Sequence, residues 1–297
     1  MICFIVNPAA GSGRAATAAA IIERMMQRHG MQHSLVYTRA AGDFSWVAEQ
    51  IDLEKCSAIA CVGGDGTVQE YVGLAVGREI SFAVIPAGSA NDLLHSVPGS
   101  LPRFRTFEEK IEHYVEKLIT GRTILADVIS VNNQSCFFNI GGTGIDIQVL
   151  KDAAPLKKTF GKAAYFLSLV KNVAGYRPEK MTLCVDGISE TGDFLLLSIC
   201  NGAYYGGKLK IAPSASIDDG YITLCKVRKM PRLKLVALFP LVKPGRHDRI
   251  KEVSIVSCKE VRLEYDGRKT INFDGNLYEL AGPLRFEVLK GAVRLVV

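Results

Sequence analysis

Apolar and polar positions alternate in two different ways along the chain. Up to residue 122, short apolar runs are separated by segments in which apolar residues recur at helical spacing. This pattern predicts strands at 2–6, 33–38, 58–62 and 81–86, and helices at 15–29, 44–51, directly after Thr67, and at 107–120. Thr106 and Glu109 have the spacing of a capping box for the last helix, which Gly121 would end. Regular alternation of strands and helices is typical of a parallel sheet covered by helices.

From Thr123 onward the pattern changes to a series of strand-like runs. They are expected at 123–131, 135–140, 181–185, 193–200, 221–227, 252–258, 261–265 and 270–273. A helix over 160–175 interrupts the series, and Asp186-Gly187 and Asp266-Gly267 have the composition of hairpin turns. We therefore expect an α/β domain with a parallel sheet at 1–122 and an antiparallel β-sandwich domain at 123–297. The sequence leaves open whether the last strand, near 288–297, returns to the first domain.

The composition is that of a protein with two packed cores. Hydrophobic residues make up 48% of the 297 positions, which is ample for two domains. The eight cysteines have no regular spacing, which suits buried thiols in a reducing cytoplasm. The chain begins with a strand-like run instead of a signal peptide, and no apolar run approaches the ~20 residues that span a bilayer. We expect a soluble cytoplasmic protein, and the sequence leaves a homodimer open.

The net charge of +6 is unevenly distributed. Nine Lys or Arg residues and a single acid, Asp248, lie between Lys226 and Lys251, around the apolar run 235–242. Basic and apolar residues together suit peripheral contact with anionic lipid at the inner membrane face. A solvated basic loop beside a core segment is the alternative interpretation. No nucleic-acid-binding motif accompanies the charge, so nucleic acid is not an expected partner.

The segment 60–70, ACVGGDGTVQE, joins an apolar strand to a glycine-rich turn around Asp65. Glycines let the backbone approach a phosphate closely. Asp65 stands where a magnesium ion bound to those phosphates would need an oxygen ligand. Thr67 and Glu70 have capping-box spacing, which predicts that a helix begins here and directs its positive end to the same place. The sequence therefore predicts an anion site beside an acidic metal site.

Two further polar turns follow strands at the same edge of the predicted sheet. The first, NPAAGSGRAA at 7–16, contains the Gly-x-Gly-x-x-Ala pattern of dinucleotide sites, although a glycine turn without a ligand is the alternative. The second strand ends without the acid that NAD requires, and Arg39 would suit NADP. The second turn, AGSAND at 87–92, follows the fourth strand, and its Asp92 is as well suited to capping a helix as to a functional role.

These motifs resemble the catalytic domain shared by diacylglycerol kinases, sphingosine kinases and bacterial lipid kinases. NPAAGSG, GGDGTVQE and PAGSANDLL occur in the family's order, and the later segments FFNIGGTGIDIQV, NGAYYGGKLKIAPSASIDDGYITL and FDGN are also similar. The layout is most similar to that of soluble bacterial diacylglycerol kinases. GGDGT also occurs in NAD kinases and so indicates only a superfamily, whereas the Asn-Pro turn and the long β domain favour a lipid substrate.

The resemblance implies roles for particular residues. Asp65 would hold the catalytic magnesium ion, with help from Asp127 across the cleft. A second, structural magnesium ion would be bound at Ser216, Asp219 and Tyr221, because hard oxygen ligands suit that ion. Without the resemblance, the turn at 218–220 would be an ordinary one. The positions that match the family's ATP-binding residues are Asn7, Pro8, Ala9, Ala10, Gly11, Thr38, Gly63, Gly64, Asp65, Gly66, Thr67, Val68, Gln69 and Ser89.

The late motif departs from the family. Asp274 and Gly275 are followed by Asn276, where the family usually has glutamate. An amide cannot accept the proton of a substrate hydroxyl, and losing a general base costs ~10²- to 10⁴-fold in rate. The change would be tolerated if Asp274 is the base. Ala10 also replaces a serine that is common in the first motif, which leaves the backbone amides in place.

The leading hypothesis is an ATP- and magnesium-dependent lipid kinase that transfers the γ-phosphoryl group to the hydroxyl of a diacylglycerol-like lipid. The α/β domain would bind the nucleotide, and the β-rich domain would bind the lipid. One alternative is a catalytically weak or inactive lipid- or nucleotide-binding member of the family, because of Asn276. A less favoured alternative is an enzyme similar to NAD kinases or an NADP-dependent enzyme.

Overall fold

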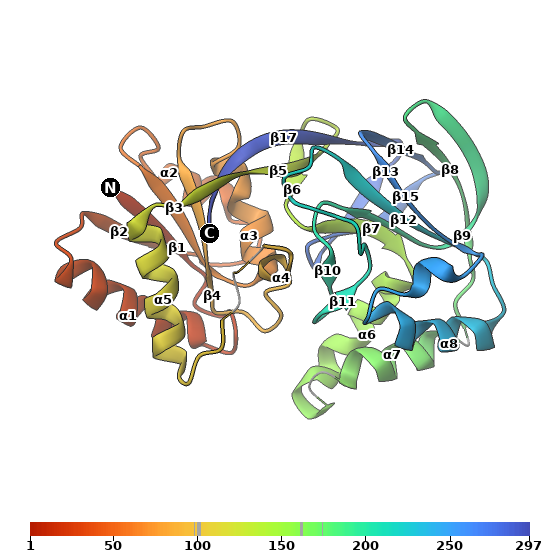
Figure 1. Cartoon of the computed structure of the whole chain (residues 1–297), viewed down its shortest axis with the longest axis horizontal. Helices are drawn as coiled ribbons and strands as arrows, with labels where there is room; N and C mark the ends of the chain where they lie inside the picture. The colour runs from red at the N-terminus through yellow and green to blue at the C-terminus, as the bar shows by residue number, and fades with distance from the viewer. Residues whose placement is uncertain (98, 100–101, 161–162, 174) are drawn as a thin grey trace.

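The computed structural model describes residues 1–97, 99, 102–160, 163–173 and 175–297. Two halves lie side by side, and both chain termini lie on the N-terminal half (Figure 1). The strands of that half are β1 (Ile2–Val6), β2 (His33–Tyr37), β3 (Ala58–Gly63) and β4 (Ser81–Pro86). Its helices are α1 (Arg14–Arg28), α2 (Phe44–Glu49), α3 (Asp65–Tyr71), the 3-10 helix η1 (Val72–Leu74), α4 (Leu93–Ser96) and α5 (Phe107–Thr120).

The four N-terminal strands pair in parallel in the order β2-β1-β3-β4. Every residue of β1 and β3 is buried, as is typical of a parallel sheet that helices cover on both faces. The parallel arrangement brings the carboxyl ends of β1, β3 and β4 to one edge of the sheet. The α/β fold predicted for this half is confirmed.

Helix α5 has both of its predicted ends. Thr106 Oγ1 accepts a hydrogen bond from the Glu109 N–H at 3.0 Å, and Gly121 follows in the left-handed conformation with φ 73°. The helix packs against α1. Lys110 Nζ donates to the Pro86 carbonyl at 2.6 Å, which ties α5 to the end of β4.

Helix α3 begins earlier than the sequence predicted. Its N-cap is Gly64, so Thr67 lies inside the helix and forms no capping box with Glu70. Thr67 Oγ1 instead accepts a hydrogen bond from Asn7 Nδ2 at 3.1 Å, and Glu70 Oε1 accepts one from the Gly42 N–H at 2.7 Å. The capping-box prediction was wrong because both side chains hold neighbouring loops.

The C-terminal half is built from antiparallel strands. They are β5 (Thr123–Val131), β6 (Ser135–Phe137), β7 (Ile140–Gly144), β8 (Glu179–Val185), β9 (Ile188–Cys200), β10 (Tyr204–Tyr205), β11 (Leu209–Lys210), β12 (Ile222–Arg228), β13 (Val253–Cys258), β14 (Glu260–Glu264), β15 (Arg268–Phe273), β16 (Asn276–Ala281) and β17 (Leu284–Val296). The helices are α6 (Ile145–Phe160), α7 (Ala163–Val173), α8 (Arg232–Val242) and the 3-10 helix η2 (His247–Arg249). A separate core that includes Phe137, Phe194 and Phe286 lies between the strands. The antiparallel, sandwich-like fold predicted for this half is confirmed.

Several segments differ from expectation. The predicted strand at 135–140 is divided into β6 and β7, because the N–H groups of Phe138 and Asn139 donate to the Asp274 carboxylate between them. The chain from 145 forms the helix α6, which the sequence did not predict. The turn at 266–267 joins β14 to β15, but these strands pair with other strands and form no hairpin. The turn at 186–187 does join the paired strands β8 and β9.

The last strand connects the two halves. Strand β17 pairs antiparallel with β14 and β5, and its end pairs parallel with β4, with Arg294 opposite Ser81. Val293 and Leu295 are buried in the N-terminal core. Figure 1 shows β17 and β5 running from one half to the other. Within the described ranges, no helix has the length and apolar character needed to cross a membrane.

Candidate active site

Three loops meet at the edge where β1, β3 and β4 end. The Gly63 carbonyl accepts hydrogen bonds from the N–H groups of Ala87 (3.0 Å) and Gly88 (2.8 Å). A Cβ atom on Gly88 would lie 2.4 Å from the Gly64 Cα. Gly11 has φ +61°, and a Cβ atom there would lie 2.0 Å from the Ala87 carbonyl oxygen. Glycine is therefore required where these loops touch.

These loops line a cleft of about 420 Å³, which we call the polar cleft. Ten of the residues predicted to bind ATP line it, namely Asn7, Pro8, Ala9, Ala10, Gly11, Thr38, Gly64, Gly66, Thr67 and Ser89. The other four, Gly63, Asp65, Val68 and Gln69, do not line it. Val68 is buried in the core, and the Gln69 side chain points to the C-terminal half, as described below.

The loop after β2 forms one wall of the polar cleft through residues 38–41. Asp43 Oδ2 accepts a hydrogen bond from the Arg39 N–H at 2.6 Å, and Tyr71 Oη donates to the other Asp43 oxygen. The Arg39 guanidinium lies 3.7 Å from the centre of the Trp46 ring. These contacts, together with the Glu70 bond to Gly42, fix the loop on α3.

A second cavity of about 250 Å³ lies next to the polar cleft and shares Gly64, Gly66, Ser89 and Asn276 with it. Asp65, Asp92 and Asp274 line this cavity, which we call the carboxylate chamber. Burial and the nearby Asp92 carboxylate raise the pKa of Asp65 to about 6. Carboxylates in mutual repulsion are stabilised by a divalent cation, so Asp65 and Asp92 suit Mg²⁺ by their chemistry. Among the described residues, three acidic side chains are not arranged around one metal position here.

Asp274 is held rigidly by the backbone. Its carboxylate accepts hydrogen bonds from the N–H groups of Phe138 (2.9 Å), Asn139 (3.0 Å) and Ile140 (2.7 Å). These bonds lower the pKa of Asp274, but burial outweighs them and raises it to about 7. A carboxyl group with this pKa gives up and accepts protons near neutral pH, as a general base requires.

Asn276 links the chamber to helix α3. Its Nδ2 donates to the Gly66 carbonyl at 3.1 Å and to Gln69 Oε1 at 2.7 Å. Tyr278 Oη also donates to Gln69 Oε1, at 2.8 Å, and Gln69 Nε2 donates to the Cys136 carbonyl at 3.4 Å. Both partners of the Asn276 amide nitrogen are acceptors, so the position requires a donor.

The sequence left the role of Asp92 open between capping and function. Its side chain does not cap α4. The carboxylate accepts hydrogen bonds from the N–H groups of Gly207 (3.0 Å) and Lys208 (3.0 Å) in the C-terminal half. Asp92 therefore lines the chamber and joins the two halves, and in the sequence only the polar turn at 87–92 indicated it.

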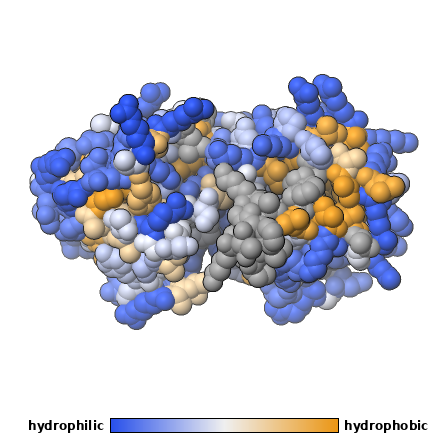
Figure 2. Space-filling view, turned by 90° about the horizontal axis from the view of Figure 1, so that it is seen from below, coloured by the Kyte–Doolittle hydropathy of each residue, from blue (hydrophilic) through white to orange (hydrophobic). Residues whose placement is uncertain are grey.

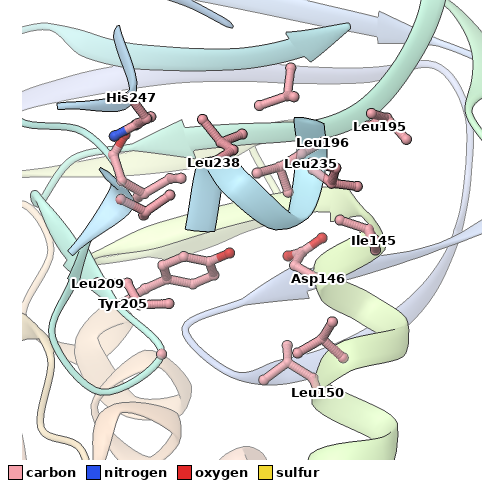
Figure 3. Close-up of a pocket in the computed structure, with 15 residues that line it drawn as sticks. Ile145, Asp146, Leu150, Leu195, Leu196, Tyr205, Leu209, Leu235, Leu238 and His247 are labelled. Carbon is pink, nitrogen blue, oxygen red and sulfur yellow. The ribbon is translucent and has the colours of Figure 1, made fainter. Parts of the chain in front are cut away.

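Beyond the chamber lies a narrow apolar pocket of about 90 Å³, which shares Leu150, Tyr205 and Gly206 with the chamber. Its walls come from α6, β9, β11 and α8 (Figure 3), and include Ile145, Leu195, Leu196, Leu209, Leu235, Leu238 and Val242. The sequence did not single out this pocket, because its walls come from distant segments.

Asp146 and His247 line the apolar pocket. Among the described residues, the buried atoms Asp146 Oδ1 and His247 Nδ1 have no hydrogen-bond partner. Burial raises the pKa of Asp146 to about 7. Figure 3 shows the Asp146 carboxyl and the Tyr205 hydroxyl turned toward one another across the pocket. An acid inside the apolar run at 140–149 was the signal in the sequence that could have identified Asp146.

Asp127 does not reach this site. Its fully buried carboxylate accepts hydrogen bonds from the N–H groups of Gly220 (2.6 Å) and Gly291 (2.7 Å). It lies under the turn that contains Ser216, Asp219 and Tyr221, where Asp219 Oδ1 accepts a hydrogen bond from the Tyr221 N–H at 2.8 Å. The expectation that Asp127 helps Asp65 to hold the catalytic magnesium ion from across the cleft is corrected, because β5 directs its carboxylate toward β17 and this turn.

The turn at 216–221 can be tested as a metal site. Burial and the nearby acids Asp127 and Asp218 raise the pKa of Asp219. Crowded acids and main-chain carbonyl oxygens are compatible with a hard cation. In the described part of the chain, no group of three or more His, Cys, Asp or Glu side chains is arranged around a common metal position.

Two family models match the chain. A diacylglycerol kinase catalytic domain matches residues 1–131, and a YegS C-terminal NAD kinase beta sandwich-like domain matches residues 140–297. The diacylglycerol kinase of Mycobacterium tuberculosis is 26% identical over 268 residues, which cover 89% of this chain and 84% of that protein. The diacylglycerol kinase of Bacillus subtilis is 27% identical over 274 residues, which cover 91% of this chain and 88% of that protein.

The fold is also found in a crystal structure of a diacylglycerol kinase from Bacillus anthracis. That structure matches with a TM-score of 0.77 at 23% identity and covers 99% of this chain and 96% of its own. At this identity the likeness concerns the fold, while the family models identify both halves of the sequence. The chain therefore belongs to the diacylglycerol kinase catalytic-domain family of lipid kinases, with a YegS-type C-terminal domain.

Proposed function

We propose that this protein transfers the γ-phosphoryl group of ATP to the hydroxyl of a diacylglycerol-like lipid. The observation that carries the proposal is the continuity of three cavities. The polar cleft shares four lining residues with the carboxylate chamber, and the chamber shares three with the apolar pocket. The polar cleft would hold the anionic nucleotide, the carboxylate chamber the reacting groups, and the apolar pocket an alkyl chain of the acceptor.

ATP would lie in the polar cleft. The N–H groups of Ala87 and Gly88 already donate to the Gly63 carbonyl, so those of Gly64, Gly66 and Ser89, which line the cleft, would bind its phosphates, with the positive end of helix α1 nearby. The wall at 38–41 would contact the nucleoside. The N-terminal half, with the end of β17, would be the nucleotide-binding unit, and the rest of the chain would receive the lipid.

Asp65 would hold Mg²⁺, and Asp92 lies in the same chamber. When bound, the ion would neutralise the phosphates and the charge that develops on them during transfer. The carbonyl oxygens of Ser216 and Tyr221 and the Asp219 carboxylate would hold a second, structural ion. The crowding of acids in both places supports these assignments.

Asp274 would accept the proton of the lipid hydroxyl. It lines the chamber, its pKa of about 7 suits a base, and three N–H groups fix its orientation. Asn276 would be a positioning residue, because its amide joins the Asp274 turn to α3. With this division of roles, the absence of the family's glutamate is compatible with catalysis.

The apolar pocket would take up part of an acyl chain, and the protein would act as a peripheral enzyme at the cytoplasmic face of a membrane. Leucines dominate the pocket walls, which supports a lipid over a dinucleotide as acceptor. A NAD kinase-like or NADP-dependent activity has no comparable support. The second candidate remains a catalytically weak lipid- or nucleotide-binding protein, for which Asn276 is the specific observation.

Radiolabelled ATP, Mg²⁺ and a mixed lipid extract test the proposal. We expect label to enter the organic phase with the native protein. Label on a soluble dinucleotide would favour the NAD kinase-like alternative instead, and no transfer at all, with ATP bound, would favour the catalytically weak protein.

A further inference from the structure

A fourth cavity, of about 370 Å³, opens beside the apolar pocket and lies outside the proposed reaction path. Its walls come from the end of α7, from β9, from the end of β12 and from the start of α8. The lining residues are Val173, Tyr176, Arg177, Pro178, Leu195, Lys229, Met230, Arg232 and Leu235. We call it the cationic pocket.

All the charged residues that line this pocket are cations. Arg177, Lys229 and Arg232 line it, and no acidic residue does. Among the described residues, none of the three has an ion pair within 4.0 Å, whereas the neighbouring Lys234 is paired with Glu252. Three cations that line one pocket without an ion-pair partner attract an anion, because their mutual repulsion is relieved when it binds.

The backbone at the start of α8 also favours binding of an anion. Arg232 is the first residue of α8, an 11-residue helix, and Pro231 at its N-cap provides no side-chain hydrogen bond. The first N–H groups of a helix have no partners within the helix, and they carry the positive end of its dipole. A phosphate group is the anion that combined arginines and helix N–H groups recognise best.

The pocket also has an apolar side. It shares Leu195 and Leu235 with the apolar pocket, so the two cavities are separated by a single layer of side chains. Tyr176 and Met230 complete the apolar wall. A ligand that joins a phosphate to a hydrocarbon region matches both sides.

The surrounding surface suits a bilayer. Leu233 on α8 is 87% exposed, and Leu167 and Val170 on the adjacent α7 are 41% and 44% exposed. Figure 2 shows hydrophobic surface gathered on the C-terminal half of the molecule and bordered by hydrophilic surface. Exposed apolar side chains next to cations are typical of a surface that binds anionic membranes.

We propose that the cationic pocket binds the phosphate of an anionic phospholipid headgroup and so docks α7 and α8 on the membrane. The exposed leucines and valine would enter the interface, and α8, whose opposite side lines the apolar pocket, would bring that pocket to the lipid. The cationic pocket shares no lining residue with the polar cleft or the carboxylate chamber and only borders the apolar pocket, through Leu195 and Leu235. It binds lipid whether or not the proposed kinase reaction occurs.

Vesicle sedimentation tests the site. The triple variant R177Q/K229Q/R232Q is compared with a matched control, R28Q/R105Q/R122Q, which removes the same charge from exposed positions of the N-terminal half. Each cation near an anionic surface contributes about fivefold to partitioning, so binding to mixed phosphatidylglycerol–phosphatidylcholine vesicles should fall about 100-fold in the first variant. The control should keep nearly native binding, and neither protein should bind pure phosphatidylcholine well.

Equal losses in the two triple variants would overturn the proposal, because they would indicate a general charge effect. Thermal stabilisation of the native protein by inorganic phosphate, lost in R177Q/K229Q/R232Q and unaccompanied by vesicle binding, would also overturn it in favour of a free-phosphate site. Phosphoryl transfer to an acceptor dispersed in detergent should be unchanged in the first variant. Absence of transfer in the native protein would contradict the proposed function alone.

Discussion

At the scale of single residues, the candidate site depends on close backbone contacts and on a few buried polar side chains. Gly11 and Gly88 lie where any Cβ atom would overlap neighbouring backbone, at 2.0 Å and 2.4 Å. Asp274 and Asn276 are each held by several hydrogen bonds, and their roles differ because one accepts and the other donates.

The replacement N276E should lower phosphoryl transfer at least tenfold. A carboxylate cannot donate to the Gly66 carbonyl or to Gln69 Oε1, and leaving a polar group unpaired in the interior costs ~1–3 kcal/mol, somewhat less for these part-buried acceptors. Initial rates at saturating ATP measure the effect. The control Y278F removes one other bond to Gln69 and should have a smaller effect. A large gain in rate would instead support the catalytically weak alternative.

The raised pKa of Asp146 predicts how stability varies with pH. Its ordinary value is 3.8 and its folded value is about 7, so the folded state binds the proton more tightly than the unfolded chain. The free energy of unfolding should therefore fall as pH rises from about 4 to about 7. D146N should remove roughly 2 kcal/mol of that fall. Urea denaturation of the native protein and D146N at pH 5 and pH 8 measures this difference. Equal pH dependence of the unfolding free energy in the two proteins would refute the prediction.

At the scale of elements, the sequence predicted the helices and strands whose bounds are set by the local spacing of apolar and capping residues. The alternation in the N-terminal half and the ends of α5 follow from apolar spacing and from the side chain of Thr106. Helix α6 was missed because its first turn continues an apolar, glycine-rich run. The start of α3 was misplaced because Thr67 and Glu70 bond to distant loops, which spacing alone does not reveal.

Removing the cap of α5 tests this account of the element. T106A should lower the free energy of unfolding by about 1 kcal/mol, because the Glu109 N–H loses its acceptor. The substitution lies outside the cavities, so the Michaelis constant for ATP should stay unchanged. Urea unfolding and steady-state kinetics check both parts, and unaltered stability would show that the cap contributes nothing.

At the scale of the whole molecule, the site forms because distant segments meet. Asp92 binds the loop at 207–208, Asn276 binds α3, and β17 carries the C-terminal residues into the N-terminal core. Most residues that line the polar cleft could be predicted from the three polar turns in the sequence. The apolar pocket and the link through Asn276 could not be predicted from the sequence, because they depend on how distant segments pack together.

The return of β17 can be tested with two substitutions on one strand. L295A should lower the free energy of unfolding by ~2–5 kcal/mol, because Leu295 is 1% exposed within the N-terminal core. L289A, at a position that is 36% exposed, should cost clearly less. Chemical denaturation compares the pair, and similar losses would contradict the packing of the strand end.

The central claim is that the carboxylate chamber carries phosphoryl transfer from ATP to a lipid. The most direct measurement is the transfer of label from γ-labelled ATP to diacylglycerol, with native protein and with D65N compared at matched fold by circular dichroism. We predict labelled lipid with the native protein and a loss of at least 1,000-fold, about 4 kcal/mol of transition-state stabilisation, with D65N. Equal labelling by the two proteins would contradict the account.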